Sequence, residues 1–140
     1  MTKNRRKFGI FIAPLLGLLA IPTIVSAADD MSLLVKSFDV DHNGVLDVAE
    51  VTNAGRAKFG ISNTEKDGSL DTKEASKAGI EKRQLAAADP NKDGALDSRE
   101  FMKVLDARFK AADADKSGTI DAKELSTEAG KALLSMLGAA

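Results

Sequence analysis

The sequence contains no cysteine, no tryptophan and no tyrosine, and only one of its 140 residues is histidine. Without cysteine the chain has no disulfide, no thiolate metal site and no cysteine nucleophile. Any bound metal must therefore be held by oxygen atoms or by His42. The same scarcity leaves no nucleophile and base that could be paired for catalysis, so we expect a protein that is not an enzyme.

Aromatic residues are also few, because six phenylalanines account for all of them. Apolar residues make up 44% of the chain and charged residues 29%, which is typical of one globular domain. We expect a core built from leucine, alanine and valine with the phenylalanines beyond the N-terminal segment, Phe38, Phe59, Phe101 and Phe109.

The N-terminal segment has the pattern of an export signal. Four basic residues among the first seven precede an apolar run from Phe8 to Ile21, and small residues end the segment at Ala27. We predict a signal peptide over residues 1–27, a mature domain over 28–140, and a periplasmic or secreted location. The Arg5-Arg6 pair resembles a twin-arginine signal. An uncleaved membrane anchor is the alternative, which Pro14 and Pro22 disfavour.

The mature chain would be acidic. Removing the four basic residues of the leader from the 20 in the chain leaves 16 against 21 acidic residues, a net charge of −5. This charge disfavours nucleic acid as a partner. We expect metal ions as partners and no membrane contact after cleavage, and the sequence identifies no protein partner.

Four copies of one twelve-residue segment follow the leader. They are DVDHNGVLDVAE at 39–50, NTEKDGSLDTKE at 63–74, DPNKDGALDSRE at 89–100 and DADKSGTIDAKE at 113–124, called loops 1 to 4 below. Each has glycine at position 6, where the chain must turn sharply, an aliphatic residue at position 8, aspartate at 9 and glutamate at 12. We expect the position-8 residues to face inward and to pair the loops through short strands.

This repeat resembles the EF-hand loop, which binds a hard cation through oxygens at positions 1, 3, 5, 7, 9 and 12. Position 7 contributes its backbone carbonyl, and position 12 a bidentate glutamate. The resemblance implies these ligands: Asp39, Asp41, Asn43, Val45, Asp47 and Glu50; Asn63, Glu65, Asp67, Ser69, Asp71 and Glu74; Asp89, Asn91, Asp93, Ala95, Asp97 and Glu100; Asp113, Asp115, Ser117, Thr119, Asp121 and Glu124.

Some residues of the loops also have interpretations that do not involve a metal. The Asp-x-x-Glu at positions 9 to 12 also fits a helix N-cap, and both roles are compatible because a helix begins there. His42 occupies position 4, which points outward in this motif, so we expect a solvated side chain rather than a ligand. We expect loop 2 to be the weakest site, because Asn63 replaces aspartate at position 1 and Glu65 takes position 3.

The segments between the loops are short. Twelve residues separate loops 1 and 2 and loops 3 and 4, and fourteen separate loops 2 and 3. Because twelve residues form one helix of about 18 Å, we predict that each connector is a single helix shared by two loops. The predicted fold is all-α, a compact helical bundle with metal loops at both ends. Helices that run up and down in succession would bring loops 1 and 3 together at one end and loops 2 and 4 at the other.

The short connectors, the aspartate at position 9, the leader and the C-terminal stretch IDAKELSTEAGKALLSML are similar to the lanmodulin family, periplasmic EF-hand proteins that bind lanthanides. A proline at loop position 2 is a feature of that family, and here Pro90 alone has it. The resemblance implies a protein that folds on binding up to four lanthanide or calcium ions. A calcium sensor or buffer of the cell envelope is the alternative, although Met31, Met102 and Met136 are too few for a methionine-rich target groove.

Overall fold

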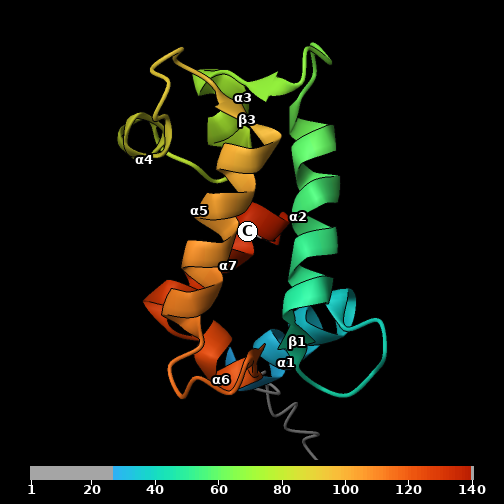
Figure 1. Ribbon diagram of the computed structural model, residues 1–140. Coiled ribbons are helices and arrows are strands. Elements are labelled where there is room, and N and C mark those ends of the chain that lie inside the picture. The colour runs from blue at the N-terminus through green and yellow to red at the C-terminus, as the bar shows by residue number, and fades with distance from the viewer. Residues whose placement is uncertain (1–26, 140) are drawn as a thin grey trace, which may run out of the picture.

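The computed structural model describes residues 27–139, which form a mostly helical bundle with very short strands at its two ends (Figure 1). The predicted signal peptide lies outside the described residues, apart from Ala27. The elements are α1 (Ala27–Phe38), β1 (Leu46–Asp47), α2 (Val48–Ser62), β2 (Ser69–Leu70), α3 (Thr72–Lys77), α4 (Lys82–Ala88), β3 (Leu96–Asp97), α5 (Ser98–Ala112), β4 (Thr119–Ile120), α6 (Ala122–Leu125) and α7 (Glu128–Leu137). The predicted all-α bundle is confirmed.

Two helices of 15 residues, α2 and α5, form the long axis of the bundle and lie side by side. Phe59 of α2 meets Phe101 of α5 edge to face, with ring centroids 5.4 Å apart. Gly55 lies on the face of α2 that meets α5, one turn before Phe59, and a Cβ there would collide with the Leu105 side chain. The small residue therefore allows the two helices to approach closely.

The helix α2 connects loops 1 and 2, and α5 connects loops 3 and 4. Each is a single helix shared by two loops, as predicted, but the middle connector between loops 2 and 3 is not. Residues 75–88 form the end of α3, a turn and then α4. Gly79 has a φ of +76°, and the Ile80 amide donates to the Ala75 carbonyl at 2.9 Å, which ends α3. The prediction of a single helix was wrong because this glycine provides a left-handed C-terminal cap in the middle of the segment.

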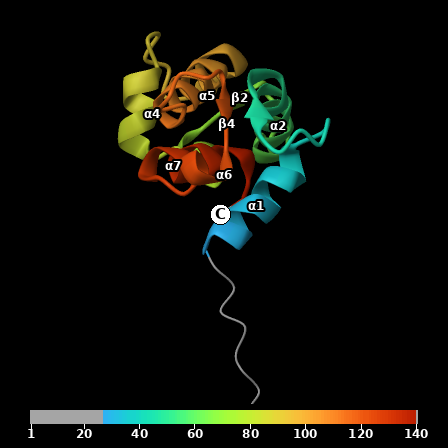
Figure 2. The same cartoon turned by 90° about the horizontal axis from the view of Figure 1, so that it is seen from below.

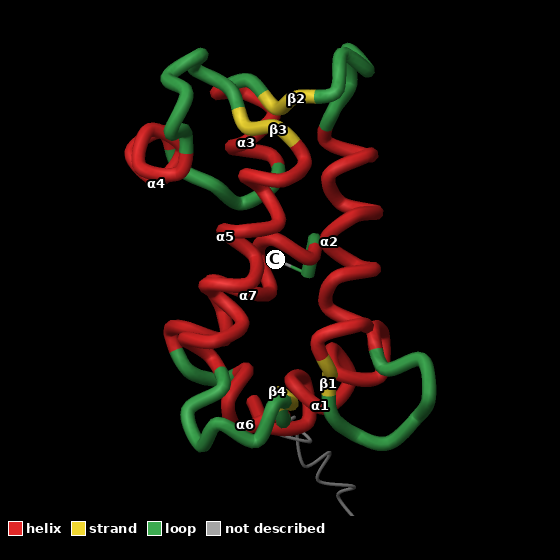
Figure 3. Tube along the Cα trace, viewed as in Figure 1, coloured by secondary structure: helices red, strands yellow, loops and turns green. Residues whose placement is uncertain are grey.

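The broken middle connector also changes which loops meet. The short strands pair β1 with β4, with Leu46 opposite Ile120, and β2 with β3, with Leu70 opposite Leu96. Loops 1 and 4 thus share one end of the bundle and loops 2 and 3 the other (Figure 3). The expected pairing of loop 1 with 3 and loop 2 with 4 was wrong, because the turn between α3 and α4 sends the chain back to the end at which it arrived.

The core lies between the two ends and is closed at each end by the paired strands. All four position-8 residues are fully buried, as expected, and α5 contributes Phe101, Leu105 and Phe109. The helix α7 packs against both α2 and α5, and buries Leu133, Leu134, Met136 and Leu137. Viewed from below, α1, α6 and α7 lie together across one side of α2 and α5 (Figure 2). Between residues 27 and 139 no helix is long and apolar enough to span a bilayer.

Candidate metal centres

Each loop ends in a helix cap made by the position-9 aspartate and the position-12 glutamate. In loop 1 the Glu50 amide donates to Asp47 Oδ1 at 2.8 Å, and the Asp47 amide donates to Glu50 Oε2 at 3.1 Å. The same reciprocal pair occurs in the other three loops. The amide of Glu100 holds the pKa of Asp97 below its ordinary value. One oxygen of the position-9 aspartate is thus used as a cap, which leaves the other for a cation or its bound water.

The position-1 aspartate accepts hydrogen bonds from backbone amides of its own loop. Asp39 accepts the Asn43 amide on Oδ1 at 3.1 Å and the Gly44 amide on Oδ2 at 2.8 Å. Burial would raise the pKa of Asp39, but these backbone donors lower it below the ordinary value. Asp89 and Asp113 accept the corresponding amides in loops 3 and 4. The carboxylate of Asp39 is therefore held as an anion at the centre of its loop.

The turn itself is the same in all four loops. Position 4 has a φ between 57° and 60°, although its residues are His42, Lys66, Lys92 and Lys116, and the glycine at position 6 has a φ between 83° and 92°. His42 is exposed, which agrees with the expectation of a solvated side chain. The four loops therefore share one backbone turn, whatever residue occupies position 4.

Two of the loops gather three carboxylates closely. Oxygens of Asp39, Asp41 and Glu50 lie within 4.8 Å of one another, and so do those of Asp113, Asp115 and Glu124. A point therefore exists within about 2.8 Å of all three oxygens, close to the 2.3 to 2.6 Å of a calcium–oxygen bond. The donor set of these loops fits a hard cation. Loops 2 and 3 place an amide at one of the equivalent positions, Asn63 at position 1 and Asn91 at position 3.

Loop 2 differs in its first residue. The Asn63 side chain cannot accept amides on two oxygens, and in the described part of the chain its buried Oδ1 has no hydrogen-bond partner. Leaving a buried oxygen without a partner costs about 1 to 3 kcal/mol, which a cation bound to that oxygen would offset. Asn63 is thus available as a neutral ligand.

The structure also reveals contacts that the sequence analysis missed. In three loops the backbone amide of the position-2 residue donates to Oε1 of the glutamate at position 12. The pairs are Val40 with Glu50, Thr64 with Glu74 and Ala114 with Glu124. The ten-residue separation hides this pairing from a local pattern. A readable signal did exist in loop 3, because Pro90 has no N–H to donate.

The structure places all predicted ligand residues in the four loops, and the half-buried position-7 residues Val45, Ser69, Ala95 and Thr119 precede the position-8 side chains that enter the core. The ligand roles themselves stay predictions. Loops 1 and 4 bring three acidic ligands together, whereas loops 2 and 3 each substitute an amide.

The comparison with protein families agrees with this geometry. The sequence pattern of the EF hand family matches residues 80–105 and 105–127, which span loops 3 and 4 with their flanking helices. No curated protein matches the chain. The matched segments and the loop architecture support EF-hand motifs in this chain, and such motifs indicate binding of calcium or a similar metal ion. EF-hand motifs are typically found in binding proteins rather than in enzymes.

Proposed function

We propose that this chain is an exported cation-binding protein whose four loops each hold one hard cation, with trivalent lanthanides preferred over calcium. The observation that carries the proposal is the charge of the loops. Each has four carboxylates at ligand positions, so 16 of the 21 acidic residues lie there. In loops 1 and 4 three of them already converge within 4.8 Å.

The charge favours the trivalent ion. Lanthanide ions match calcium in size and also prefer oxygen ligands, but they have one more positive charge. A loop with four carboxylates would retain a net charge of about −1 with a lanthanide and about −2 with calcium. The aspartate at position 9 contributes to this difference in every loop, because its second oxygen is not needed for the helix cap.

The same crowding supports folding that depends on metal. Three carboxylates within 4.8 Å repel one another, each pair by about 1 kcal/mol even in water and more inside a protein. Without a cation this repulsion opposes closure of the loops, and the small core offers few aromatic contacts to offset it. A bound cation reverses the sign of the interaction, so binding and folding are coupled.

Export is supported by the basic and apolar pattern of residues 1–27. Cleavage after Ala27 would remove only the first residue of α1. The inward-facing side chains of this helix, including buried Val35, would remain in the mature domain. The expected cut is therefore compatible with an intact bundle.

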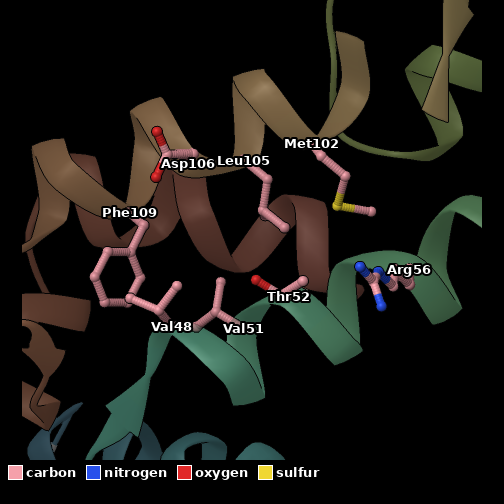
Figure 4. Close-up of a pocket in the computed structure, with 8 residues that line it drawn as sticks. All are labelled: Val48, Val51, Thr52, Arg56, Met102, Leu105, Asp106 and Phe109. Carbon is pink, nitrogen blue, oxygen red and sulfur yellow. The ribbon is translucent and has the colours of Figure 1, made fainter. Parts of the chain in front are cut away.

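A calcium sensor or buffer is the second candidate, and one surface favours it. A groove of about 130 Å³ runs between α2 and α5, with Val51, Leu105 and Phe109 on its floor and Arg56 and Asp106 at its rim (Figure 4). Sensor EF-hand proteins use apolar grooves of this kind to bind target helices. Met102 is the only methionine among its lining residues.

A metal competition separates the two candidates. The chain is titrated with La³⁺ and with Ca²⁺ from a chelator-treated start, and helix content is followed by far-UV circular dichroism. The proposal predicts a gain of helix at far lower free La³⁺ than free Ca²⁺. A full helical change at micromolar Ca²⁺ would favour the calcium sensor. A variant with all four position-12 glutamates changed to glutamine, which removes four ligand charges, should show neither response.

A further inference from the structure

The position-12 glutamates differ in how many donors already occupy them. Glu124 Oε1 accepts one amide, from Ala114 at 2.9 Å. Glu50 Oε1 accepts the Val40 amide at 2.6 Å and, more weakly, the Asp41 amide at 3.4 Å. The residue at position 2 therefore provides the closest donor in loops 1 and 4.

Loops 2 and 3 are the two extremes. Glu74 Oε1 accepts three donors, the Thr64 amide at 2.6 Å, the Thr64 hydroxyl at 2.8 Å and the Glu65 amide at 3.3 Å. Proline at position 2 of loop 3 has no N–H, and within the described chain the Glu100 carboxylate accepts only the Asp97 amide, on Oε2 at 2.9 Å. One oxygen of Glu100 is thus open, and the matching oxygen of Glu74 is crowded.

The number of donors matters because a carboxylate oxygen has about two acceptor sites. Bidentate binding by the position-12 glutamate requires one site on each oxygen to face the cation. Glu100 meets this condition without losing a hydrogen bond, and Glu124 has one site left on Oε1. On Glu74, three donors exceed the sites of one oxygen, so a donor must leave before the cation can bind both oxygens.

The Thr64 hydroxyl is the donor that only loop 2 has. The other position-2 residues, Val40, Pro90 and Ala114, have no hydroxyl. Position 1 does not explain a weak loop 2 equally well, because the buried Asn63 Oδ1 has no hydrogen-bond partner among residues 27–139 and can take a cation. Loop 2 also has as many carboxylates as each of the other loops.

We propose that the residue at loop position 2 sets the order in which the loops bind cations: loop 3 first, loops 4 and 1 next and loop 2 last. In loop 2 the Thr64 hydroxyl weakens cation binding, because it occupies Glu74 Oε1. The inference rests on the proposed metal-binding function of all four loops. It adds a group that controls access to the ligands rather than a ligand.

The test is a titration of the full chain with La³⁺, in which each loop is followed separately by the ¹H–¹⁵N NMR signal of its position-6 glycine, Gly44, Gly68, Gly94 or Gly118. Gly94 should respond first and Gly68 last. Thr64→Val keeps the shape and removes the hydroxyl, so it should raise the affinity of loop 2 about tenfold. Thr64→Ser keeps the hydroxyl and is the matched control, which should leave Gly68 last. The reciprocal Pro90→Thr should delay Gly94.

The outcomes distinguish this inference from the proposed function. If Gly68 stays last in Thr64→Val but advances in Asn63→Asp, position 1 governs loop 2 and the inference is overturned. If the glycines respond to La³⁺ in an order that neither position-2 variant changes, the inference fails and metal binding stands. If no glycine responds in any variant, both are refuted.

Discussion

Removing one ligand charge from loop 1 should lower its preference for lanthanide by about tenfold. In Asp41→Asn the ligand oxygen stays, since asparagine occupies the same position 3 in loop 3 as Asn91. The Asp41, Asp39 and Glu50 oxygens lie within 4.8 Å of one another, so a shared cation lies about 3 Å from each carboxylate charge. At that distance each unit of cation charge interacts with a carboxylate by about 1.4 kcal/mol even at the dielectric constant of water. La³⁺ has one more unit of charge than Ca²⁺, so the substitution should cost it about 1.4 kcal/mol more binding free energy. This difference is a factor of about ten in relative affinity.

The assay is a competition between La³⁺ and Ca²⁺ for loop 1, read from the Gly44 amide signal in the parent chain and the variant. Asp106→Asn is the matched control, because it makes the same charge change on α5, where Asp106 pairs with Lys110 at 2.7 Å outside the loops. The control should leave the ratio of affinities unchanged. Equal losses for both ions in Asp41→Asn would refute the argument that charge sets the preference.

Further predictions concern folding and acid sensitivity. Far-UV circular dichroism should show less helix with excess chelator than with metal, and identical spectra would contradict coupled folding. Gly130→Ala should destabilise the folded chain by about 1 to 3 kcal/mol, because the added Cβ would meet the backbone of Leu125. Gly60→Ala is the matched control, because its Cβ would meet nothing within 4 Å. It should stabilise α2 by about 0.5 to 1 kcal/mol in denaturant titrations. Equal effects would be inconsistent with this packing. The Thr64 hydroxyl and amide lower the pKa of Glu74. Their contribution to the stability of the folded chain is therefore present above the ordinary glutamate pKa and is lost as pH falls through the lowered value. NMR titration of Thr64→Val should show a higher Glu74 pKa.

The loops could be predicted from the sequence because each is determined within twelve residues. The glycine at position 6, the cap at positions 9 and 12 and the aliphatic residue at position 8 act on their neighbours in the chain. The structure accordingly has the turn at Gly44, the capping pair of Asp47 and Glu50 and the buried Leu46 where the pattern placed them.

The break in the middle connector also has a local signal in the sequence. Gly79 falls where a helix C-cap is expected, and Glu81 and Gln84 have the spacing of a capping box, with the Glu81 amide donating to Gln84 Oε1 at 3.0 Å. Connector length alone favoured one helix. Local cap signals at residues 79–84 outweighed it.

The pairing of the loops depends on the tertiary structure as well as on this turn. Arg108 of α5 donates to the carbonyls of Gly79 at 3.1 Å and Ala132 at 2.7 Å, so it joins the turn after α3 to α7. These partners lie 29 and 24 residues away, beyond the reach of any local pattern. Sequence by itself determined the four loops and their helix caps, because those interactions are local. Which loops share an end depended on one turn and on the packing of α5 against α7, because only contacts between distant segments select among ways of stacking the same helices.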